Sequence, residues 1–472
     1  MRHHWAVTAP TPDRAAAAAL GNALRKLGYE EDTLDDLLDE DAYSGKTEDV
    51  LVAARRLPTS RLGTAIRLLF LQLPVPEAEA VDALGREAVE ALTVTGLAEL
   101  RGDVVPTSRL VPISDVLLAS DGFTRDADDP PDYVASYTPT ARTCDVLTVR
   151  TRGRRALDVG TGSGIHALLA ARRHDDVVAV DVNPRALAYT ELNAALNGFD
   201  NVECRVGSFF EPVVGETFDL ITCNAPYVVS PERRWAYRDS GLRGDDLTAL
   251  LVRATGEHLA TGGYATLLGS WLVTRGDDPE ERPVAWVEET GCDGWVLASP
   301  VTDPLEHAAS WNSQFFGDPT GYEAALDEWT AYLAELGARG VVEGALLLHR
   351  RGAGRPTVRV DEIDEDSLEP AGKQIRRAFA NRARLAGMRR SDLAAARLAR
   401  AMPLRIERDV GRRDGELALD DGTNSVLPAT ATGIRVVEAL NGKATLKRLG
   451  ADRATLSLCR DLLELGALRF AR

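Results

Sequence analysis

The stretch LDVGTGSG at residues 157–164 decides the fold of this chain. An apolar run comes first, a glycine-rich turn follows, and the helix-forming run HALLAARR at residues 166–173 comes directly after. Glycine residues permit positive φ angles and let the backbone approach a ligand closely. The stretch therefore predicts a strand, a tight turn that binds a ligand, and a helix.

Strand-like and helix-like runs alternate on either side of this turn, over residues 133–351. The predicted strands are RALDVG (155–160), VVAVDV (177–182), VECRVG (202–207), DLITCN (219–224), YATLLGSWLV (264–273) and a last strand at Val341–His349. The run PRALAYTELNAAL (184–196) predicts a helix between the second and third strands. Such alternation builds a doubly wound α/β sheet, so residues 133–351 are predicted to form one α/β domain.

An acidic residue ends the second strand of this domain. Asp181 stands 17 residues after Gly164, where a carboxylate can accept both hydrogens of a ribose diol. Two cofactor classes fit this arrangement, a dinucleotide and S-adenosylmethionine. The turn lacks the GxGxxG spacing of dinucleotide-binding proteins. Asp158, just before the first glycine, suits S-adenosylmethionine better, because it can reach the methionine amino group directly or through water.

The fourth strand ends in Asn224-Ala225-Pro226-Tyr227. Together with the glycine turn and Asp181, this element resembles class I S-adenosylmethionine-dependent methyltransferases of the branch with an Asn-Pro-Pro-Tyr/Phe signature. That branch includes the methyltransferases of release-factor glutamine and the small-domain ribosomal RNA guanine methyltransferases. The resemblance covers about residues 135–350, and it implies a Rossmann-like sheet with S-adenosylmethionine as cofactor.

The resemblance also implies how a planar NH2 group is methylated. The side-chain oxygen of Asn224 and the backbone carbonyl of Ala225 are the expected acceptors of its two hydrogens, and Tyr227 is expected to stack on the flat substrate. The chain departs from the family at Ala225, which replaces the first proline of the signature. It departs again at Gly207-Ser208-Phe209, where the family has Gly-Asp; here Ser208 can accept the adenine hydrogen bond and Phe209 can pack on the ring.

Most of the expected functional residues belong to a catalytic group or to a cofactor-binding group. Catalysis is assigned to Asn224, Ala225, Pro226 and Tyr227. Cofactor binding is assigned to Thr138, Asp158, Gly160, Thr161, Gly162, Gly164, Asp181, Val182, Ser208, Phe209 and Asn224. For Thr138, capping of a helix is the alternative role. Tyr237, with Arg238 and Asp239, could form a substrate lid or a solvated loop, and Trp311 and His166 are expected only to pack.

Composition limits the class of protein. The 472 residues are 44% hydrophobic and 27% charged, which is typical of a globular protein with real cores. There is no apolar run that could cross a membrane and no apolar leader, so we expect no membrane partner. The five cysteines are widely spaced and never form CxxC, which indicates a cytoplasmic protein without a zinc site or other metal. The sequence indicates no oligomeric state.

Two smaller segments flank the α/β domain. Residues 1–125 predict helices, then strands LAEL and VVPTSRLVPI around a turn at Gly102, and residues 371–472 predict a basic helix followed by strands and helices. Both resemble winged-helix-like α+β domains. The acidic, proline-containing stretch Thr124–Asp132 and the stretch Gly352–Pro370 are the predicted boundaries.

Charge is distributed unevenly along the chain. The net charge is −17, yet residues 373–413 carry 13 basic and 3 acidic residues, which leaves the remainder near −27. One hypothesis is a grip on polynucleotide phosphates, and the other is pairing with the acidic runs at 361–369 and 30–49. The basic residues proposed for the grip are Arg376, Arg377, Arg382, Arg384, Arg389 and Arg390.

These features predict an S-adenosylmethionine-dependent N-methyltransferase that acts on a macromolecule. The first hypothesis for the acceptor is an exocyclic base amine in RNA, held by the basic segment and the flanking domains. The second is an amide nitrogen of a protein or peptide, of the glutamine type. The third is a protein that binds S-adenosylmethionine but is catalytically weak, because of the departures at Ala225 and Ser208.

Overall fold

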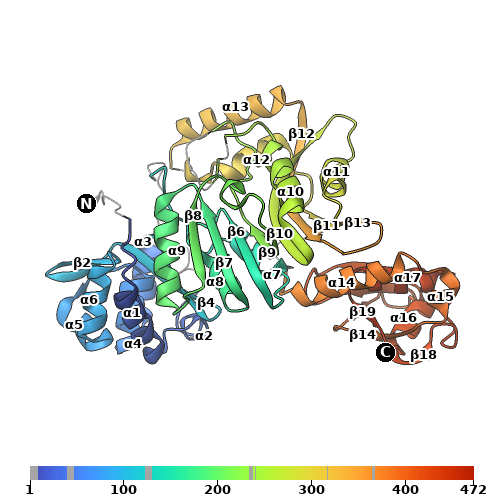
Figure 1. Cartoon of the computed structure of the whole chain (residues 1–472), viewed down its shortest axis with the longest axis horizontal. Coiled ribbons are helices and arrows are strands. Elements are labelled where there is room, and N and C mark those ends of the chain that lie inside the picture. The colour runs from blue at the N-terminus through green and yellow to red at the C-terminus, as the bar shows by residue number, and fades with distance from the viewer. Residues whose placement is uncertain are drawn as a thin grey trace.

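The computed structural model describes residues 9–39, 47–122, 130–232, 238–239, 241–315, 317–363 and 367–471. Figure 1 shows three units side by side: an N-terminal unit (α1 to β5), a central unit (α7 to β13) and a C-terminal unit (α14 to β19). The central unit holds the large sheet, and the two outer units lie on either side of it.

The central unit is built on one eight-stranded sheet with the strand order β13-β11-β12-β10-β9-β6-β7-β8. Its strands are β6 (Gly153–Val159), β7 (His174–Asp181), β8 (Val202–Val206), β9 (Phe218–Cys223), β10 (Leu259–Thr274), β11 (Asp293–Ala298), β12 (Ala338–His349) and β13 (Val358–Glu362). All neighbouring pairs are parallel except the two that β12 makes with β10 and β11. The chain reverses its direction of travel between β6 and β9, and in such sheets ligands bind at this switch point.

Helices cover both faces of this sheet because alternate side chains of each strand point to opposite faces. Leu267 and Leu346 belong to the core formed with α10 and α11, whereas Leu268 and Leu347 belong to the core shared with the C-terminal unit. The helices of the central unit are α7 (Pro139–Leu147), α8 (Ile165–Ala171), α9 (Pro184–Leu196), η3 (Glu211–Val213), α10 (Asp246–His258), α11 (Glu281–Glu289), α12 (Pro304–Trp311), η4 (Ser313–Phe315) and α13 (Pro319–Glu335). The predicted doubly wound α/β architecture is confirmed.

The sheet extends further than the sequence predicts. The expected last strand is present as β12, but β11 and β13 were not predicted. β13 lies inside the stretch predicted as a boundary and pairs in parallel with β11. The sequence VRVDE has too few residues and too little apolar character to stand out as a strand, and its partner β11 supplies the missing pairing energy. Edge strands of this kind depend on tertiary pairing more than on their own pattern.

The N-terminal unit begins with helices and continues into two small antiparallel sheets. Its elements are α1 (Arg14–Leu27), α2 (Glu31–Asp35), α3 (Thr47–Arg56), α4 (Arg61–Ala65), the π-helical turn η2 (Ile66–Phe70), β1 (Val75–Pro76), α5 (Glu77–Leu84), α6 (Arg86–Val94), β2 (Ala98–Arg101), β3 (Asp103–Pro106), β4 (Ser108–Ile113) and β5 (Val116–Asp121). The hairpin predicted at Gly102 is confirmed.

The predicted strand VVPTSRLVPI is divided in two. Thr107 ends β3, because its N–H donates to the Leu97 carbonyl at 3.0 Å and its hydroxyl donates to the Gly96 carbonyl at 2.6 Å. Beyond Thr107 the chain leaves the first sheet, and β4 pairs with β5 in a separate two-stranded ribbon. A single strand was therefore the wrong prediction here, since both halves are apolar and only their partners distinguish them.

Two asparagines of α9 bind the ribbon to the central unit. Asn193 Oδ1 accepts from Ala119 N, and its Nδ2 donates to Ala119 O, both at 2.8 Å. One helical turn later, Asn197 Oδ1 accepts from Leu117 N at 2.9 Å and its Nδ2 donates to Leu117 O at 2.7 Å. The spacing between residues four apart on a helix is close to the spacing between residues two apart on a strand. Asn193 and Asn197 therefore form hydrogen bonds with the edge of β5 as the backbone of a neighbouring strand would.

The C-terminal unit contains two small antiparallel sheets and four helices. Its elements are α14 (Gly372–Leu385), α15 (Arg390–Ala394), β14 (Arg397–Arg400), β15 (Arg405–Glu407), β16 (Gly415–Ala418), β17 (Val426–Ala429), α16 (Ala431–Glu438), β18 (Asn441–Thr445), α17 (Arg453–Glu464) and β19 (Leu468–Phe470). The sheets have the orders β18-β14-β19 and β15-β16-β17. The prediction of a basic helix followed by strands and helices is confirmed.

Arg382 joins the C-terminal unit to the central sheet, and this placement corrects its prediction as a phosphate ligand. Its side chain is buried, donates to the Glu464 carbonyl at 2.9 Å and to the Gly294 carbonyl at 3.3 Å, and stacks 4.3 Å from the centre of the Trp295 ring. Burial lowers the pKa of Arg382 to about 9, so the group still carries charge at neutral pH. A guanidinium enclosed in this way cannot reach a polynucleotide.

None of the described helices combines the length and the apolar character that a bilayer crossing requires.

Replacing Arg382 is expected to destabilise the protein. Arg382→Ala removes two buried hydrogen bonds and the stacking on Trp295, and should lower the free energy of unfolding by about 2–4 kcal/mol. Urea unfolding followed by tryptophan fluorescence measures the change. The matched control is Arg376→Ala, an exposed residue of the same helix, which should shift stability by less than about 0.5 kcal/mol. Equal small effects of both variants would contradict the interface role of Arg382.

Candidate functional site

A cavity of about 680 Å³ opens where the loops after β6, β7 and β9 converge. Its wall contains most of the residues predicted from sequence, because these three strands are parallel neighbours and their carboxyl ends meet at one edge. The predicted residues that line it are Thr138, Gly160, Thr161, Gly162, Asp181, Val182, Ser208, Phe209, Asn224, Ala225, Pro226 and Tyr227.

The glycine turn needs its glycines for conformation and for space. Gly160, Gly162 and Gly164 have φ angles of 68°, 55° and 90°. A Cβ atom on Gly160 would lie 3.3 Å from the Cα of Ala225, and one on Gly164 would lie 2.8 Å from the hydroxyl oxygen of Thr190. Gly164 therefore packs α8 against α9 without lining the cavity, and Gly160 lets the turn touch the Asn224 loop.

Asp158 supports the turn from below. Its carboxylate is buried and accepts from the Thr161 hydroxyl at 2.7 Å, the Thr222 hydroxyl at 2.8 Å and the Ala167 N–H at 3.2 Å. It is not among the residues that line the cavity. These hydrogen bonds serve the turn, α8 and β9, and the contact with the cofactor stays a prediction.

Asp181 presents its carboxylate at the cavity wall. Oδ2 accepts from Gly162 N at 2.9 Å and Oδ1 accepts from Asn183 N at 2.8 Å, which fixes the orientation of the group. Burial raises the pKa of Asp181, and the backbone N–H groups of Asn183 and Gly162 counteract this only in part. Each carboxylate oxygen retains a lone pair, as a ribose diol requires.

An apolar slot lies next to Asp181. Val182 is 54% exposed although it is aliphatic, and Phe209 lines the same cavity with a positive φ of 48°. A non-glycine residue in this conformation stores strain, and such strain is common where a loop is shaped for a ligand. Val182 and Phe209 thus offer flat apolar surface to an aromatic base, with Ser208 between Phe209 and the end of β8.

Asn224 is oriented by a residue that the sequence analysis did not identify. Its Nδ2 lies 3.5 Å from the hydroxyl of Thr140, and that hydroxyl lies 2.9 Å from the hydroxyl of Thr138. Thr138 also caps α7 by accepting from Ala141 N, which is its alternative role, and it lines the cavity, where cofactor binding stays a prediction. With its amide nitrogen toward Thr140, Asn224 has its Oδ1 directed to the other side of the amide.

The backbone after Asn224 is held from β10. The hydroxyl of Ser270 donates to the Tyr227 carbonyl at 2.5 Å, and Tyr227 forms an isolated antiparallel bridge with Asp239. Tyr227 lines the cavity and is otherwise buried. No local motif surrounds Ser270, which lies in the middle of a long strand, so only the tertiary structure identifies it.

Aromatic and charged groups form the opposite part of the wall, which consists of Arg238, Asp239 and Trp311. Arg238 is buried, donates to Asp239 at 2.8 Å and to the Trp311 carbonyl at 3.1 Å, and ion-pairs with Glu232. Trp311, expected only to pack, contributes to the cavity from α12. Tyr237, the third residue of the predicted lid, lies outside the residues that the structure describes.

Two buried polar atoms of the cavity wall lack a hydrogen-bond partner among the described residues. They are the hydroxyl oxygen of Ser136 and Nε2 of His166. Buried polar atoms are almost always hydrogen-bonded, so each of these two atoms requires a partner such as an ordered water. The wall fits S-adenosylmethionine through a carboxylate for the ribose and an apolar slot for the base.

The predicted basic residues lie on the C-terminal unit and do not line the cavity. Arg376 and Arg384 are exposed, the latter 3.9 Å from the centre of the Phe470 ring, and Arg377 donates to the Gly466 carbonyl. Arg389 pairs with Asp392 on its own helix instead of with the acidic runs. The described residues also contain no group of three or more His, Cys, Asp or Glu side chains that could hold a metal ion.

Two family models match parts of the chain. Residues 150–239 match a model described as a methyltransferase domain. Residues 26–108 match a model described as a domain of unknown function (DUF7059).

Curated relatives match the central unit. The release factor glutamine methyltransferase of Xylella fastidiosa is 36% identical over 130 residues, which are 25% of this chain and 47% of that protein. The ribosomal protein uL3 glutamine methyltransferase of Bradyrhizobium diazoefficiens is 31% identical over 164 residues, which are 31% of this chain and 51% of that protein. The chain spans about half the length of the curated relatives it matches.

Among solved structures, the tRNA methyltransferase of M. jannaschii is 12% identical, and the match covers 52% of this chain and 58% of that chain with a TM-score of 0.33. A likeness of this size says nothing about the substrate.

Asp181 is expected to control cofactor affinity and its pH dependence. Asp181→Asn removes a charged acceptor of the ribose hydroxyls and should weaken S-adenosylmethionine binding about tenfold to a hundredfold in calorimetry. In the native protein, affinity should fall as the pH drops through the raised pKa of Asp181, at a higher pH than an ordinary aspartate would show. This loss of affinity at low pH should be absent from Asp181→Asn.

The matched control is Asp175→Asn, an exposed aspartate of the same strand, which should leave affinity and its pH dependence unchanged. Native affinity in Asp181→Asn would refute the assignment of this carboxylate to the ribose.

Proposed function

Because the central unit is a class I S-adenosylmethionine-dependent methyltransferase domain, we propose that the protein transfers the cofactor's methyl group to a planar NH2 nitrogen of a macromolecule. The observation that carries the proposal is the contact between the glycine turn at Gly160 and the Asn224-Ala225 loop. The contact supports a site in which the oxygens that bind the acceptor lie at the edge of the cofactor cavity.

Different residues of the wall bind different parts of the cofactor. Asp181 holds the ribose, and Val182 and Phe209 hold the base. When bound, S-adenosylmethionine would supply an electrophilic methyl group on a sulfonium, whose C–S bond breaks as the C–N bond forms and leaves its electron pair on the sulfur of S-adenosylhomocysteine. Every other part of the chemistry is positioning by the chain itself.

An NH2 group on an amide or a base is a poor nucleophile because its lone pair is delocalised. Two hydrogen-bond acceptors in fixed positions can draw its hydrogens out of the plane and aim the lone pair at the methyl carbon. Oδ1 of Asn224 and the carbonyl of Ala225 are these acceptors. One N–H proton leaves after the new C–N bond forms, and the oxygen that holds it passes it to water.

Loss of the signature proline does not leave the loop unsupported. Ala225 keeps the carbonyl that the chemistry needs and is itself buried. The Ser270 hydroxyl and the bridge to Asp239 hold the backbone two residues later, at Tyr227. This support favours a working enzyme over the catalytically weak binding protein.

A glutamine-type amide of a protein is the acceptor that we favour. Both curated relatives are named as glutamine methyltransferases. Tyr227 and Trp311 give the cavity flat aromatic surface, on which a planar amide can lie. This order differs from the expectation from sequence, in which the RNA base amine came first.

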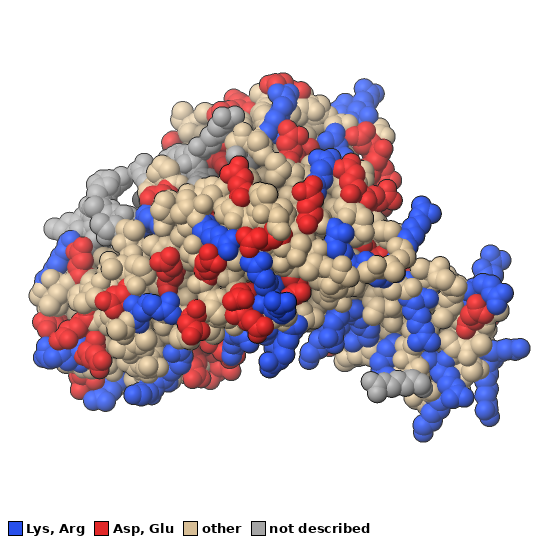
Figure 2. All heavy atoms as spheres, in the orientation of Figure 1, with Lys and Arg blue, Asp and Glu red and all other residues tan. Residues whose placement is uncertain are grey.

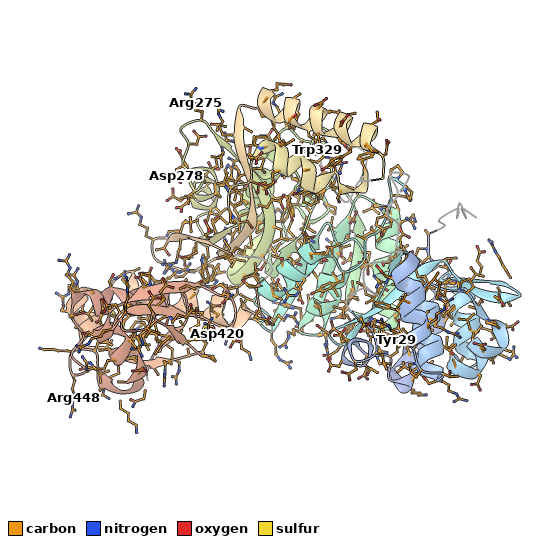
Figure 3. All side chains as sticks on the ribbon, turned by 180° about the vertical axis from the view of Figure 1, so that it is seen from behind. Tyr29, Arg275, Asp278, Trp329, Asp420 and Arg448 are labelled. Carbon is orange, nitrogen blue, oxygen red and sulfur yellow. The ribbon has the colours of Figure 1, made fainter. Side chains whose placement is uncertain are left out.

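An exocyclic base amine in RNA is the second candidate, and the charge of the C-terminal unit favours it. Figure 2 shows that most charged side chains on the visible face of this unit are basic, and Arg448 points away from the unit in Figure 3. Burial lowers the pKa of Arg377, and the guanidinium groups of Arg376 and Arg469 lower it further, which shows that three cations lie close together. Arg376 and Arg469 have no ion pair among the described residues.

We also propose that the outer units select the acceptor and that the chain divides into domains at 1–125, 133–351 and 371–472. From α4 to β3 the N-terminal unit has the order helix, strand, helix, helix, hairpin, with the sheet order β1-β3-β2. This order supports the winged-helix-like expectation for that unit. Both acceptors belong to the cytoplasm, and the five free cysteines fit a reducing compartment.

Asn224→Ala should separate binding from catalysis. The variant keeps Asp181, Val182 and Phe209 for the ribose and the base but loses one of the two acceptors of the NH2 hydrogens, so turnover should fall at least about a hundredfold. Calorimetry with S-adenosylhomocysteine should give a Kd within about twofold of the native value. A fully active variant would refute the role of Asn224.

The acceptor is identified by labelling a cell extract with methyl-labelled S-adenosylmethionine and the native protein, with Asn224→Ala as the blank. Under the favoured proposal, protease removes the label, nuclease does not, and complete digestion releases methylglutamine. Label that nuclease removes would select the RNA candidate. Label in neither fraction, with cofactor binding intact, would select the catalytically weak binding protein.

The RNA candidate makes a separate prediction. Arg376→Gln combined with Arg469→Gln should weaken binding of single-stranded RNA and reduce the slope of log K against log salt concentration by roughly 1.4. Fluorescence anisotropy over a salt series measures both. The matched control combines Arg448→Gln with Arg453→Gln, two exposed cations elsewhere on the unit, and should retain more affinity. Equal losses in both pairs would show that the cation cluster is not a specific surface.

A further inference from the structure

One wall of the cofactor cavity comes from a segment without regular secondary structure. Residues 130–138 contain no helix or strand, yet Tyr133, Val134, Ala135 and Ser136 line the cavity together with Asp181. A wall of this kind needs contacts from outside to hold its shape. Those contacts come from the end of the N-terminal ribbon.

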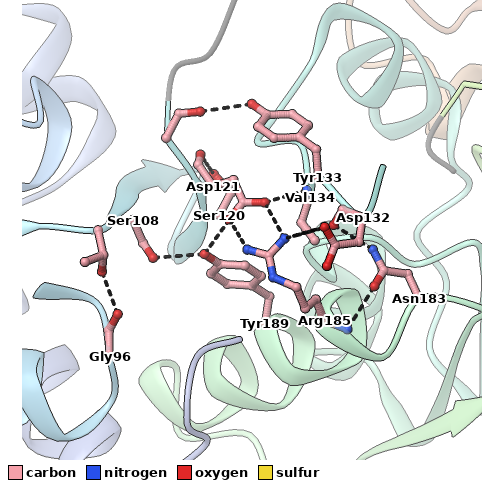
Figure 4. A network of polar contacts seen from close by, with 12 residues as sticks. Gly96, Ser108, Ser120, Asp121, Asp132, Tyr133, Val134, Asn183, Arg185 and Tyr189 are labelled. Carbon is pink, nitrogen blue, oxygen red and sulfur yellow. Dashed lines mark hydrogen bonds and ion pairs between the residues drawn. The ribbon is translucent and has the colours of Figure 1, made fainter. Parts of the chain in front are cut away.

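Asp121, the last residue of β5, binds the segment twice. Its backbone N–H donates to the Val134 carbonyl at 3.1 Å, and its Oδ2 accepts from the Val134 N–H at 2.7 Å. The side chain of Asp121 is only 4% exposed. This arrangement fixes the backbone of Val134, and Figure 4 shows Asp121 at the centre of a larger polar network.

Arg185 of α9 is the second centre of that network. Its guanidinium donates to both oxygens of Asp121, at 2.5 and 2.9 Å, and to the Asp132 carbonyl at 2.9 Å. The side chain of Arg185 is 8% exposed. A buried bidentate pair is geometrically demanding, so Arg185 holds the start of the cavity wall at a set distance from α9.

The network continues to the carboxylate assigned to the ribose. Asn183 donates from Nδ2 to the same Asp132 carbonyl at 2.9 Å, and its backbone N–H donates to Asp181 Oδ1 at 2.8 Å. The side-chain oxygen of Asn183 also caps α9 by accepting from Arg185 N at 2.9 Å. An unbroken series of hydrogen bonds therefore joins Asp121 to Asp181.

In the other direction the network reaches the first strand of the ribbon. The Tyr189 hydroxyl donates to Asp121 Oδ1 at 2.9 Å and lies 2.9 Å from the hydroxyl of Ser108 in β4. Ser108 and Asp121 are paired across the ribbon, so both strands contribute to one buried cluster. The N-terminal unit is thereby connected to the cofactor site through α9.

We propose that Asp121 and Arg185 are positioning residues for S-adenosylmethionine, through which docking of the N-terminal unit completes the cofactor site. The network holds the 130–136 wall against Asp181, so that the cofactor meets a preformed cavity. If the network is broken, the wall becomes ordered only when the cofactor binds, and the free energy that this ordering costs lowers the affinity for the cofactor. The inference rests on the proposed cofactor and is independent of the acceptor.

The test compares two isosteric variants of the full chain. Asp121→Asn removes the charge that orients Arg185 and should raise the Kd for S-adenosylhomocysteine roughly tenfold in calorimetry, with stoichiometry unchanged. The matched control is Asp115→Asn, in the turn of the same ribbon, where the exposed carboxylate pairs with Arg172 of the central unit. Its Kd should stay within about twofold of the native value.

Hydrogen exchange of residues 130–136, with and without ligand, distinguishes a positioning role from a purely structural one. In the native protein, S-adenosylhomocysteine should add little protection to residues 130–136, because the wall is already ordered. In Asp121→Asn the wall should exchange faster without ligand and regain protection when ligand binds. If Asp121→Asn does not fold, Tyr189→Phe, which removes one donor to the same carboxylate, should show the same pattern with a smaller change.

The outcomes are distinguishable. A native protein that does not bind S-adenosylhomocysteine overturns the proposed function itself. Native binding with an unchanged Kd in the folded Asp121→Asn or Tyr189→Phe variant overturns only the positioning role. An equal loss of affinity in Asp115→Asn also overturns it, because the effect would then come from the ribbon in general.

Discussion

The buried carboxylate of Asp158 is the interaction on which the rest of the central unit depends. It accepts hydrogen bonds from the turn at Thr161, from the start of α8 at Ala167 and from β9 at Thr222. A charge in the core is tolerated only when such donors satisfy it. These contacts fix the glycine turn against β9, which brings Gly160 next to Ala225. The cofactor turn and the acceptor loop thus have one common support.

The two outer units are attached by different physical means. The N-terminal ribbon is held by amide side chains that imitate a neighbouring strand, and by the buried pair of Asp121 and Arg185. The C-terminal unit is held by an apolar core and by the stacked guanidinium of Arg382. The first attachment continues by hydrogen bonds into the cofactor wall, whereas the second lies away from the cavity. This difference suits an N-terminal unit that completes the site and a C-terminal unit that offers its basic surface to an acceptor.

Under the proposed function, chemistry and acceptor choice come from separate parts of the chain. An amide and a base amine both present a planar NH2 group, so the Asn224-Ala225 loop would bind them alike. We therefore propose that discrimination comes from the rim around Trp311 and from surfaces outside the cavity. The curated relatives match only about a third of the chain or less.

The sequence by itself determined the α/β fold, the glycine turn, the position of Asp181 and the acceptor loop. These depend on local periodicity and on motifs a few residues long, which survive without knowledge of distant partners. Only the tertiary structure decided that Asp158 lies beneath the turn, that Arg382 is buried while Arg376 is exposed, and that Trp311 and Ser136 reach the cavity. Neighbouring arginines on one helix look alike in sequence, and their environments differ because segments far away in the chain pack against one and leave the other in water. The positioning role proposed for Asp121 has the same origin, since its partners lie 13 to 68 residues away and meet only when the N-terminal ribbon docks on α9.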